Sequence, residues 1–389
     1  MMAAASGAGQ GGTWGEALRR LRAMTIKEFI QMRRDRLTFA MMVGVPVMQL
    51  VLFGYAINMD PRGLPTAVLV ADQSVYGRSI VAALQNTGYF EVTHRADTEA
   101  ELDHLLRAGR VQFGVQIPGG FARALQRGER PPLLVLADAT DPAATGNAVA
   151  ALDRLLTTAL RRDLTGPSAA LQPQLAPFEI IVHRRYNPAG DTQVNIVPGL
   201  LGVVLTLSML LFTALAVTRE VERGTMESLL AMPVRPVEVM LGKIMPYVLV
   251  GFVQTALILA AALLLFDVPM RGSLTLLLGL TTLFIVATLS VGYTFSTVAK
   301  NQLQAVQMSF FFFLPNLLLS GFMFPFRGMP EWAQWLGEAL PLTHFVRVVR
   351  GVMLKGSGVD DMVPDVAGLL AFMALAMLVA LVRFRRTLD

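Results

Sequence analysis

The stretch GSLTLLLGLTTLFIVATLSVGYTFSTVA, residues 272–299, contains 28 consecutive residues without a charged side chain. An α-helix rises about 1.5 Å per residue and needs roughly 20 apolar residues to cross about 30 Å of hydrocarbon. The stretch therefore predicts a membrane-spanning helix. Five more uncharged runs predict spans in the same way: Leu37–Met59, Thr192–Thr218, Ile244–Phe266, Asn301–Phe326 and the shorter Val366–Val382.

The composition agrees with a membrane protein. Hydrophobic residues make up 54% of the 389-residue chain and charged residues only 16%, against about 25% charged residues in soluble globular proteins. This deficit excludes a soluble enzyme. The net charge is +5, but the basic residues are scattered, so no nucleic-acid partner is expected. The absence of cysteine excludes disulfides, thiolate metal sites and cysteine nucleophiles.

The basic residues predict the orientation of the spans. With the N-terminus in the cytoplasm, the inner segments carry 15 Lys and Arg residues and the short outer segments carry 5. Because inner segments of membrane proteins are enriched in Lys and Arg, both termini are expected in the cytoplasm, in a multi-pass protein of the inner (plasma) membrane.

A polar region separates the first two spans. Residues 61–190 contain 13 basic and 12 acidic residues, which is the charge density of a soluble domain. Short apolar segments predict strands here, and periodic segments between them predict helices. The expected strands are Leu64–Ala71, Phe90–His94, Val111–Ile117, Leu133–Ala137 and Glu179–Arg184, and the expected helices are Tyr76–Asn86, Thr98–Ala108, Phe121–Gln126 and Pro142–Asp163. This alternation predicts a small α/β domain, and the topology places it outside the cytoplasm.

The fold class expected is thus an α-helical polytopic membrane protein with six transmembrane helices and an extracytoplasmic α/β domain inserted between helices 1 and 2. A basic amphipathic pattern begins with Trp14, Leu18 and Leu21. It favours a helix that lies in the membrane interface, and the alternative is a cytosolic helix that packs on a partner protein. The expected organisation is a disordered N-terminus 1–13, interfacial helix 14–36, spans 37–59, 192–218, 244–266, 272–299, 301–326 and 365–383, α/β domain 60–190, cytoplasmic loop 219–243, external re-entrant or interfacial helices 327–363 and tail 384–389.

Catalytic and metal-binding motifs are not found. Gly242-Lys243 is followed by Ile244 and lacks the upstream glycine of a phosphate-binding loop, so no cofactor is expected in this chain. The four histidines lack metal-ligand spacing, and each is expected to be a satisfied surface side chain. No nucleophile elbow is present, so no catalytic residue is expected.

Uncharged polar residues remain within the predicted spans. Such groups usually form hydrogen bonds between helices, and lining a substrate path is the less common role. The candidates for a substrate path are Gln49, Asn195, Gln254, Gln307 and Asn316.

A charged segment follows the second span. It reads REVERGTMESLLAMP, residues 219–233, and predicts a short amphipathic helix that begins near Thr225 and stops at Pro233. These properties alone specify no partner, and an ordinary charged loop is the alternative.

This segment resembles the E-[RK]-x-G-T-[LM]-E-x-L-L-x-x-P signature of ABC-2-type transporter permeases. Residues 340–345, LPLTHF, with Arg347 and Arg350, resemble the P-x-T-H-[FA] segment before the last span of the same family. The order of spans and external domain is also similar, from about Trp14 to Leu388.

The resemblance implies the transmembrane subunit of an ABC exporter. A separate ATPase subunit would bind Mg-ATP, and a second permease chain, identical or paralogous, would complete twelve spans in the lipid bilayer. A periplasmic adaptor and an outer-membrane channel are further partners known in the family. The substrate implied is amphipathic or hydrophobic, a drug-like molecule or a lipid. The residues implied in coupling to the ATPase are Glu220, Glu222, Arg223, Gly224, Thr225 and Glu227.

Two other functions fit a polytopic chain. A membrane receptor or sensor would bind a ligand in its external domain, but it would need a cytoplasmic signalling domain, and the inner segments are short. An ion-coupled secondary transporter would need ionisable residues at depth, and the central parts of the predicted spans contain none.

Overall fold

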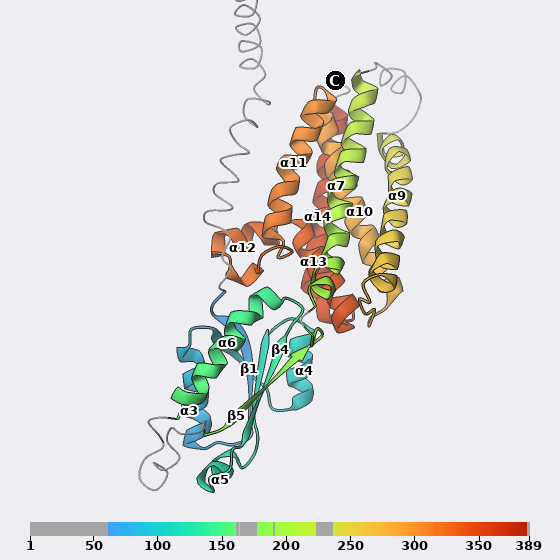
Figure 1. Ribbon diagram of the computed structural model, residues 1–389. Helices are drawn as coiled ribbons and strands as arrows, with labels where there is room; N and C mark the ends of the chain where they lie inside the picture. The colour runs from blue at the N-terminus through green and yellow to red at the C-terminus, as the bar shows by residue number, and fades with distance from the viewer. Residues whose placement is uncertain (1–60, 161–162, 164–176, 190, 223–235, 387–389) are drawn as a thin grey trace, which may run out of the picture. The chain divides into compact units, whose positions relative to one another are not determined.

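The computed structural model describes residues 61–160, 163, 177–189, 191–222 and 236–386. The predicted interfacial helix, the first predicted span with Gln49, and residues 223–235 lie outside these ranges. The described residues form an α/β region followed by a set of long helices (Figure 1).

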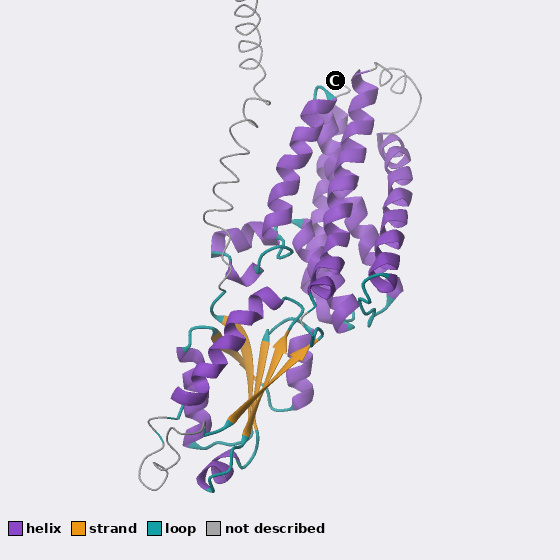
Figure 2. Cartoon of the chain, viewed as in Figure 1, coloured by secondary structure: helices purple, strands orange, loops and turns teal. Residues whose placement is uncertain are grey.

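The α/β region contains one mixed sheet of five strands in the order β2-β1-β3-β4-β5 (Figure 2). Only β3 and β4 pair antiparallel, and the other neighbours pair parallel. The strands are β1 (Leu64–Val70), β2 (Phe90–Arg95), β3 (Phe113–Ile117), β4 (Pro132–Asp138) and β5 (Glu179–Arg185).

Helices cover both faces of this sheet. They are α3 (Val75–Asn86), α4 (Glu99–Arg107), α5 (Phe121–Gln126) and α6 (Pro142–Thr158). Along β1, Leu64 and Val68 pack with α3, α5 and α6, whereas Ala67 and Leu69 pack with α4. Successive side chains of a strand point to opposite faces, so the apolar run of β1 is buried on both sides.

These elements occur where the sequence predicts them. The ends of most strands and helices differ by one or two residues, and the largest difference is at α6, which ends at Thr158 rather than at Asp163. The pattern was informative because the sheet is buried on both faces and each helix buries a single side.

The long helices are α7 (Thr192–Glu222), α9 (Pro236–Leu264), α10 (Leu274–Val298), α11 (Gln302–Leu319) and α14 (Val363–Arg386). Each contains a segment long and apolar enough to cross a membrane, which gives five candidate spans among the described residues. Helix α7 packs against α9, α10 and α11, and α10 packs against α14.

Shorter helices fill the sequence between α11 and α14. They are η3 (Phe326–Gly328), α12 (Glu331–Glu338), α13 (Pro341–Arg350), the π-helical turn η4 (Gly351–Lys355) and η5 (Asp360–Met362). Helix α11 ends at Leu319, seven residues before the predicted end of the span at Phe326. The chain turns there because Gly321 adopts a φ of +77°, a conformation that favours glycine.

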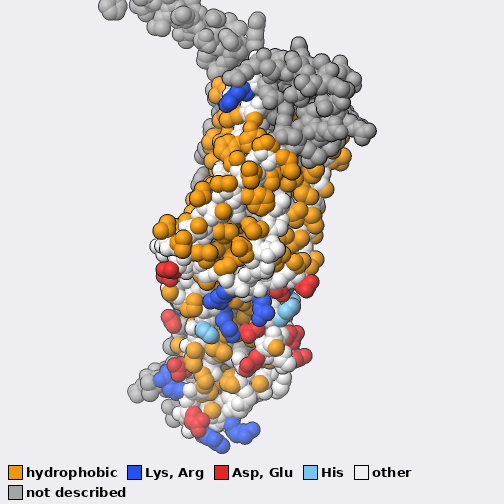
Figure 3. Space-filling view, turned by 90° about the vertical axis from the view of Figure 1, so that its right-hand side faces the viewer, with side chains coloured by type: hydrophobic (Ala, Val, Ile, Leu, Met, Phe, Trp, Pro, Cys, Tyr) orange, Lys and Arg blue, Asp and Glu red, His pale blue; other side chains and the backbone are white. Residues whose placement is uncertain are grey.

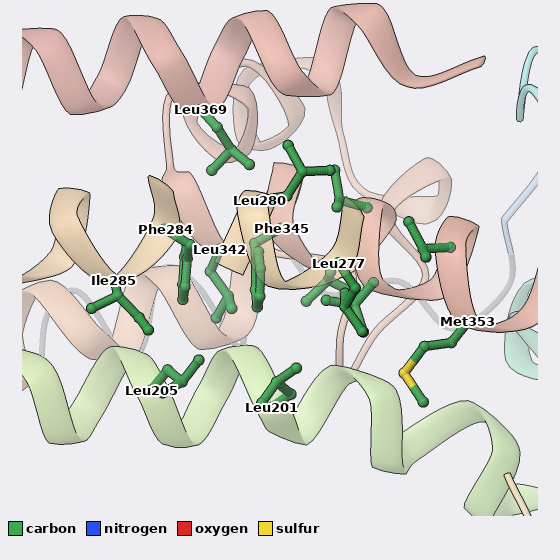
Figure 4. Packing of buried hydrophobic residues seen from close by; sticks show 14 of the residues in the cluster. Leu201, Leu205, Leu277, Leu280, Phe284, Ile285, Leu342, Phe345, Met353 and Leu369 are labelled. Carbon is green, nitrogen blue, oxygen red and sulfur yellow. The ribbon is translucent and has the colours of Figure 1, made fainter. Parts of the chain in front are cut away.

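Helix α13 lies in the core of the helical set. Figure 4 shows Phe345 of α13 beside Phe284 of α10. Leu201 and Leu205 extend from α7 toward these two rings. The two phenylalanine rings are stacked, with centroids 4.0 Å apart and an interplanar angle of 4°. Leu369 of α14 belongs to the same cluster. Helix α13 is too short to cross a membrane, and it joins the three long helices α7, α10 and α14.

The outer faces of the long helices are apolar. On α9, Leu249, Leu257 and Leu264 are 68%, 65% and 79% exposed. In Figure 3 hydrophobic side chains cover the visible face of these helices. Leucine so exposed to water would be unfavourable, whereas contact with lipid chains is the expected environment for such a face.

Candidate functional site

The C-terminal end of α7 is bonded to the N-terminal end of α11. The backbone N–H of Gln302 donates to Oε1 of Glu222 at 2.7 Å, and Nε2 of Gln302 donates to Oε2 at 2.5 Å. These two hydrogen bonds hold the pKa of Glu222 below its usual range. The carboxylate also lies at the positive end of the α11 dipole, which favours a negative charge. Two spans that are distant in sequence are thus joined where the predicted coupling segment begins.

Most of the predicted coupling residues lie outside the residues that the structure describes. Four of them fall in residues 223–235: Arg223, Gly224, Thr225 and Glu227. For Glu220 the structure describes only the helical backbone. Glu222 is exposed at the last position of α7. Its contact with Gln302 could not be predicted, because nothing in the signature points to a partner 80 residues away.

The amides predicted to line a substrate path do not gather in one place. Asn195 lies near the start of α7 and Gln307 near the start of α11. Since the end of α7 meets the start of α11, these amides are roughly 30 Å apart along the helix axes. Gln254 lies midway along α9. The side-chain oxygens of all three are buried and accept no hydrogen bond from the described residues.

Asn316 has a structural partner instead. Its Oδ1 accepts a hydrogen bond from the backbone N–H of Leu342 at 3.4 Å, and its Nδ2 donates to the carbonyl of Phe312 at 3.1 Å. Leu342 is in the first turn of α13, where backbone N–H groups lack partners within the helix. Asn316 therefore supports the start of α13.

An ionic cluster around the buried His344 lies where α13 meets α12 and the start of α14. The His344 ring faces two acceptors, with Nδ1 2.9 Å from Oδ1 of Asp365 and Nε2 2.8 Å from the carbonyl oxygen of Glu338. Arg347 donates to the carboxylates of Glu338 and Asp365, at 2.7 Å to Oε1 of Glu338 and 3.2 Å to Oδ1 of Asp365. His344 is only 7% exposed, so the expectation that every histidine is a surface side chain was wrong here.

The contacts of His344 determine its protons. A carbonyl oxygen can only accept, so Nε2 must carry hydrogen. Nδ1 faces a carboxylate, so one more proton lies between the ring and Asp365. Burial by itself lowers the pKa of His344, but the hydrogen bonds to Asp365 and to the Glu338 carbonyl outweigh it and raise the pKa above the ordinary value of 6.5.

Glycines allow this cluster to pack closely. A Cβ atom built on Gly368 of α14 would lie 2.5 Å from Nε2 of His344. A Cβ atom on Gly202 of α7 would lie 2.6 Å from Leu342 and 2.9 Å from Phe345. Helix α13 can therefore approach α7 and α14 only because these two positions have no side chain.

A second buried contact joins the sheet to the turn after α13. Nζ of Lys355 lies 2.5 Å from Oδ2 of Asp138 at the end of β4, and 5.5 Å from the ring centre of Tyr186. The hydroxyl of Ser357 donates to the carbonyl of Arg107 at 3.2 Å. Burial, assisted by the charge of Asp138, raises the pKa of Tyr186 to about 12, so its hydroxyl stays protonated.

A cavity of about 450 Å³ is bounded by the ionic cluster around His344 and by the contact between Lys355 and Asp138. Its lining comes from α4 and the loop after it, the end of β4, the turn after α11, and α12, α13 and η4. In the sequence, His344, Arg347 and Arg350 stand out only as part of a motif. A histidine and two arginines in a segment between spans were a signal for an ionic cluster, but the partner carboxylates could be identified only from the fold.

Comparisons with known proteins agree with one another. The family model described as "ABC-2 family transporter protein" matches residues 36–382. Over 373 residues the chain is 29% identical to the "Probable multidrug ABC transporter permease YbhS" of Escherichia coli K12, covering 95% of this chain and 98% of that protein. It is 30% identical over 340 residues to the "Inner membrane transport permease YhhJ" of the same organism, covering 84% and 86%.

Proposed function

Since this chain belongs to the ABC-2 transporter family and is an ABC transporter permease, we propose that it exports an amphipathic or hydrophobic molecule, drug-like or lipid, with ATP hydrolysed by a separate subunit. The family implies such an ATPase partner. The observation that carries the proposal is the position of Glu222, which joins two candidate spans at the end where the signature segment begins.

The orientation proposed places the Glu222 end in the cytoplasm and the α/β region outside. The charges support it: Arg219, Lys300 and Arg383 lie at or beyond the cytoplasmic ends of α7, α10 and α14. The contacts of Lys355 and Ser357 with the α/β region are made beyond the opposite end of α7. The predicted span 37–59 lies outside the described residues. With it, the proposed chain crosses the inner membrane six times and has both termini in the cytoplasm.

Coupling is proposed to run through residues 220–227. An ATPase that binds the segment after Glu222 would pull on the end of α7 directly. Because Glu222 holds the first N–H of α11 and the Gln302 side chain, the same displacement would move α11 as well. The residues that take part are Glu220, Glu222, Arg223, Gly224, Thr225 and Glu227.

The substrate class is proposed from the lining of the spans. No Asp, Glu, Lys, Arg or His occurs within α10 or α11, and buried amide oxygens of Asn195, Gln254 and Gln307 are free to accept hydrogen bonds from a ligand. A path of this kind suits a molecule with a large apolar surface and few donors. A second permease chain would provide the other wall, and an adaptor with an outer-membrane channel is a further proposed partner.

Inside-out vesicles containing the permease and its ATPase test this function. ATP is expected to drive a fluorescent amphipathic dye into the vesicle lumen, which corresponds to export from the cell. Gly224→Pro or Glu227→Lys is expected to abolish uptake while ATP hydrolysis continues. Uptake without ATP, or uptake that depends on a proton or sodium gradient alone, would contradict the proposal.

A further inference from the structure

Arg350 is a buried cation with unsatisfied donors. It lies at the end of α13, is 9% exposed, and lines the cavity. Its Nη1 donates to the carbonyl of Gly321 at 3.1 Å, but Nε and Nη2 have no hydrogen-bond partner among the described residues. No described carboxylate forms an ion pair with it. A buried guanidinium in this state is uncommon, since buried charges are normally paired.

Four of the five carboxylates that line the cavity have partners other than Arg350, and the fifth is Asp141. Asp138 pairs with Lys355, and Glu338 and Asp365 pair with Arg347. Asp361 lies 3.6 Å from His104. Beside Arg350, the lining includes three arginines for which the structure shows no ion pair with a described residue: Arg107, Arg110 and Arg327. The lining thus contains six Lys and Arg residues and five Asp and Glu residues, with His344 beside them, so its net charge is positive.

Helix α12 indicates the depth of the cavity in the membrane. Trp332, Trp335 and Leu336 are 39%, 74% and 53% exposed, whereas Gln334 and Glu338 of the same helix line the cavity. Tryptophan is enriched at the level of the lipid head groups. In Figure 3 charged side chains gather just beyond the apolar surface of the long helices. The cavity therefore lies at the depth where head-group phosphates are found.

We propose that this cavity binds a phosphate group, with Arg350 as the central ligand and Arg327 and Arg110 as supporting cations. A guanidinium has paired N–H groups that match two oxygens of a phosphate, and Nε with Nη2 is one such pair. Several cations around one cavity favour a phosphate because it carries up to two charges. This inference does not rest on the direction or coupling of transport, so it stands or fails separately from the proposed function.

Binding to the purified full-length permease in detergent, without the ATPase, tests the site. Isothermal titration calorimetry measures the affinity for inorganic phosphate, for short-chain phosphatidic acid, and for zwitterionic phosphatidylcholine with the same acyl chains. Arg350→Gln keeps an N–H donor for Gly321 and removes the charge. It is expected to weaken phosphatidic acid binding about tenfold or more, as for loss of a charge-assisted pair. Arg127→Gln, at an exposed position in the α/β region, is the matched control and should change nothing.

The ligands distinguish two sources of the phosphate. Tighter binding of phosphatidic acid than of phosphate identifies a lipid head group, and equal binding identifies a free phosphate. If Arg350→Gln does not fold, the exposed pair Arg110→Gln and Arg327→Gln replaces it, with the same expected loss. Affinities that are unchanged in these variants, or wild-type protein that binds neither phosphate nor phosphatidic acid, would overturn the proposal.

Discussion

Lys355 and Asp138 form an ion pair across 217 residues of sequence, with side chains only 10% and 7% exposed. It joins the end of β4 to the π-helical turn that follows α13. Since α13 also packs against α7, α10 and α14, this pair links the α/β region to the centre of the helical set. A movement of α13 would be transmitted to the sheet through this contact.

Removing one partner of this pair should be costly. Lys355→Met leaves the Asp138 carboxylate buried without a cation, and we expect a loss of about 3–5 kcal/mol in stability. Thermal unfolding in detergent should show a large fall in Tm for Lys355→Met and a smaller fall for the double variant with Asp138→Asn. Arg127→Ala, which removes an exposed ion pair with Glu129, is the control and should have little effect. Equal losses in the single and double variants would show that the pair itself is not the cause.

Stability should depend on pH through His344. The pKa of this ring is raised on folding, so its protonated form stabilises the folded chain fully below about pH 6.5. That contribution is lost as the pH rises through the higher folded pKa. Wild-type Tm is therefore expected to fall above pH 6.5, and this fall should be smaller in His344→Gln. The matched control is His183→Gln, at an exposed position on β5. A His344→Gln profile identical to wild type would contradict the assignment.

Gly368 provides a test of close packing. Gly368→Ala places a methyl group within 2.5 Å of the His344 ring, so the ring or α14 must shift. We expect a loss of about 1–3 kcal/mol, as for other overpacked sites. Gly279→Ala on α10 is the matched control, because its Cβ meets nothing within 4 Å. If both substitutions gave the same Tm, the contact between α13 and α14 would be looser than described.

The Glu222 carboxylate should matter for coupling more than for folding. Glu222→Ala removes both hydrogen bonds to Gln302, whereas Glu222→Gln keeps an oxygen that can accept one. ATP-driven transport is expected to fall strongly in Glu222→Ala and partly in Glu222→Gln, with Tm close to wild type because the site is exposed. Glu331→Ala, also exposed, serves as the control on α12. Full transport by Glu222→Ala would show that α11 does not depend on this contact.

Features set by local pattern could be predicted from the sequence. The uncharged run 272–299 contains α10, and the apolar segment 64–71 contains β1, because burial imposes a length and a period that are visible in the sequence. The end of α11 could not be predicted, since Ser320, Gly321 and Phe322 are as uncharged as the span and only the turn at Gly321 ends it. The burial of His344 and Arg350 was also not predictable, because it depends on Gly368, Asp365 and Gly321, which the fold brings from other segments.

We propose above all that a separate ATPase acts on this permease through the segment that begins at the end of α7. Gentle purification from the native host, with identification of co-purifying chains by mass and an ATP hydrolysis assay, tests it most directly. We predict an ATPase subunit in about equal amount, and its loss when Glu222 and Glu227 are both replaced by alanine. A chain that purifies alone and supports no ATP hydrolysis with any neighbouring gene product would show that this permease has no such ATPase partner.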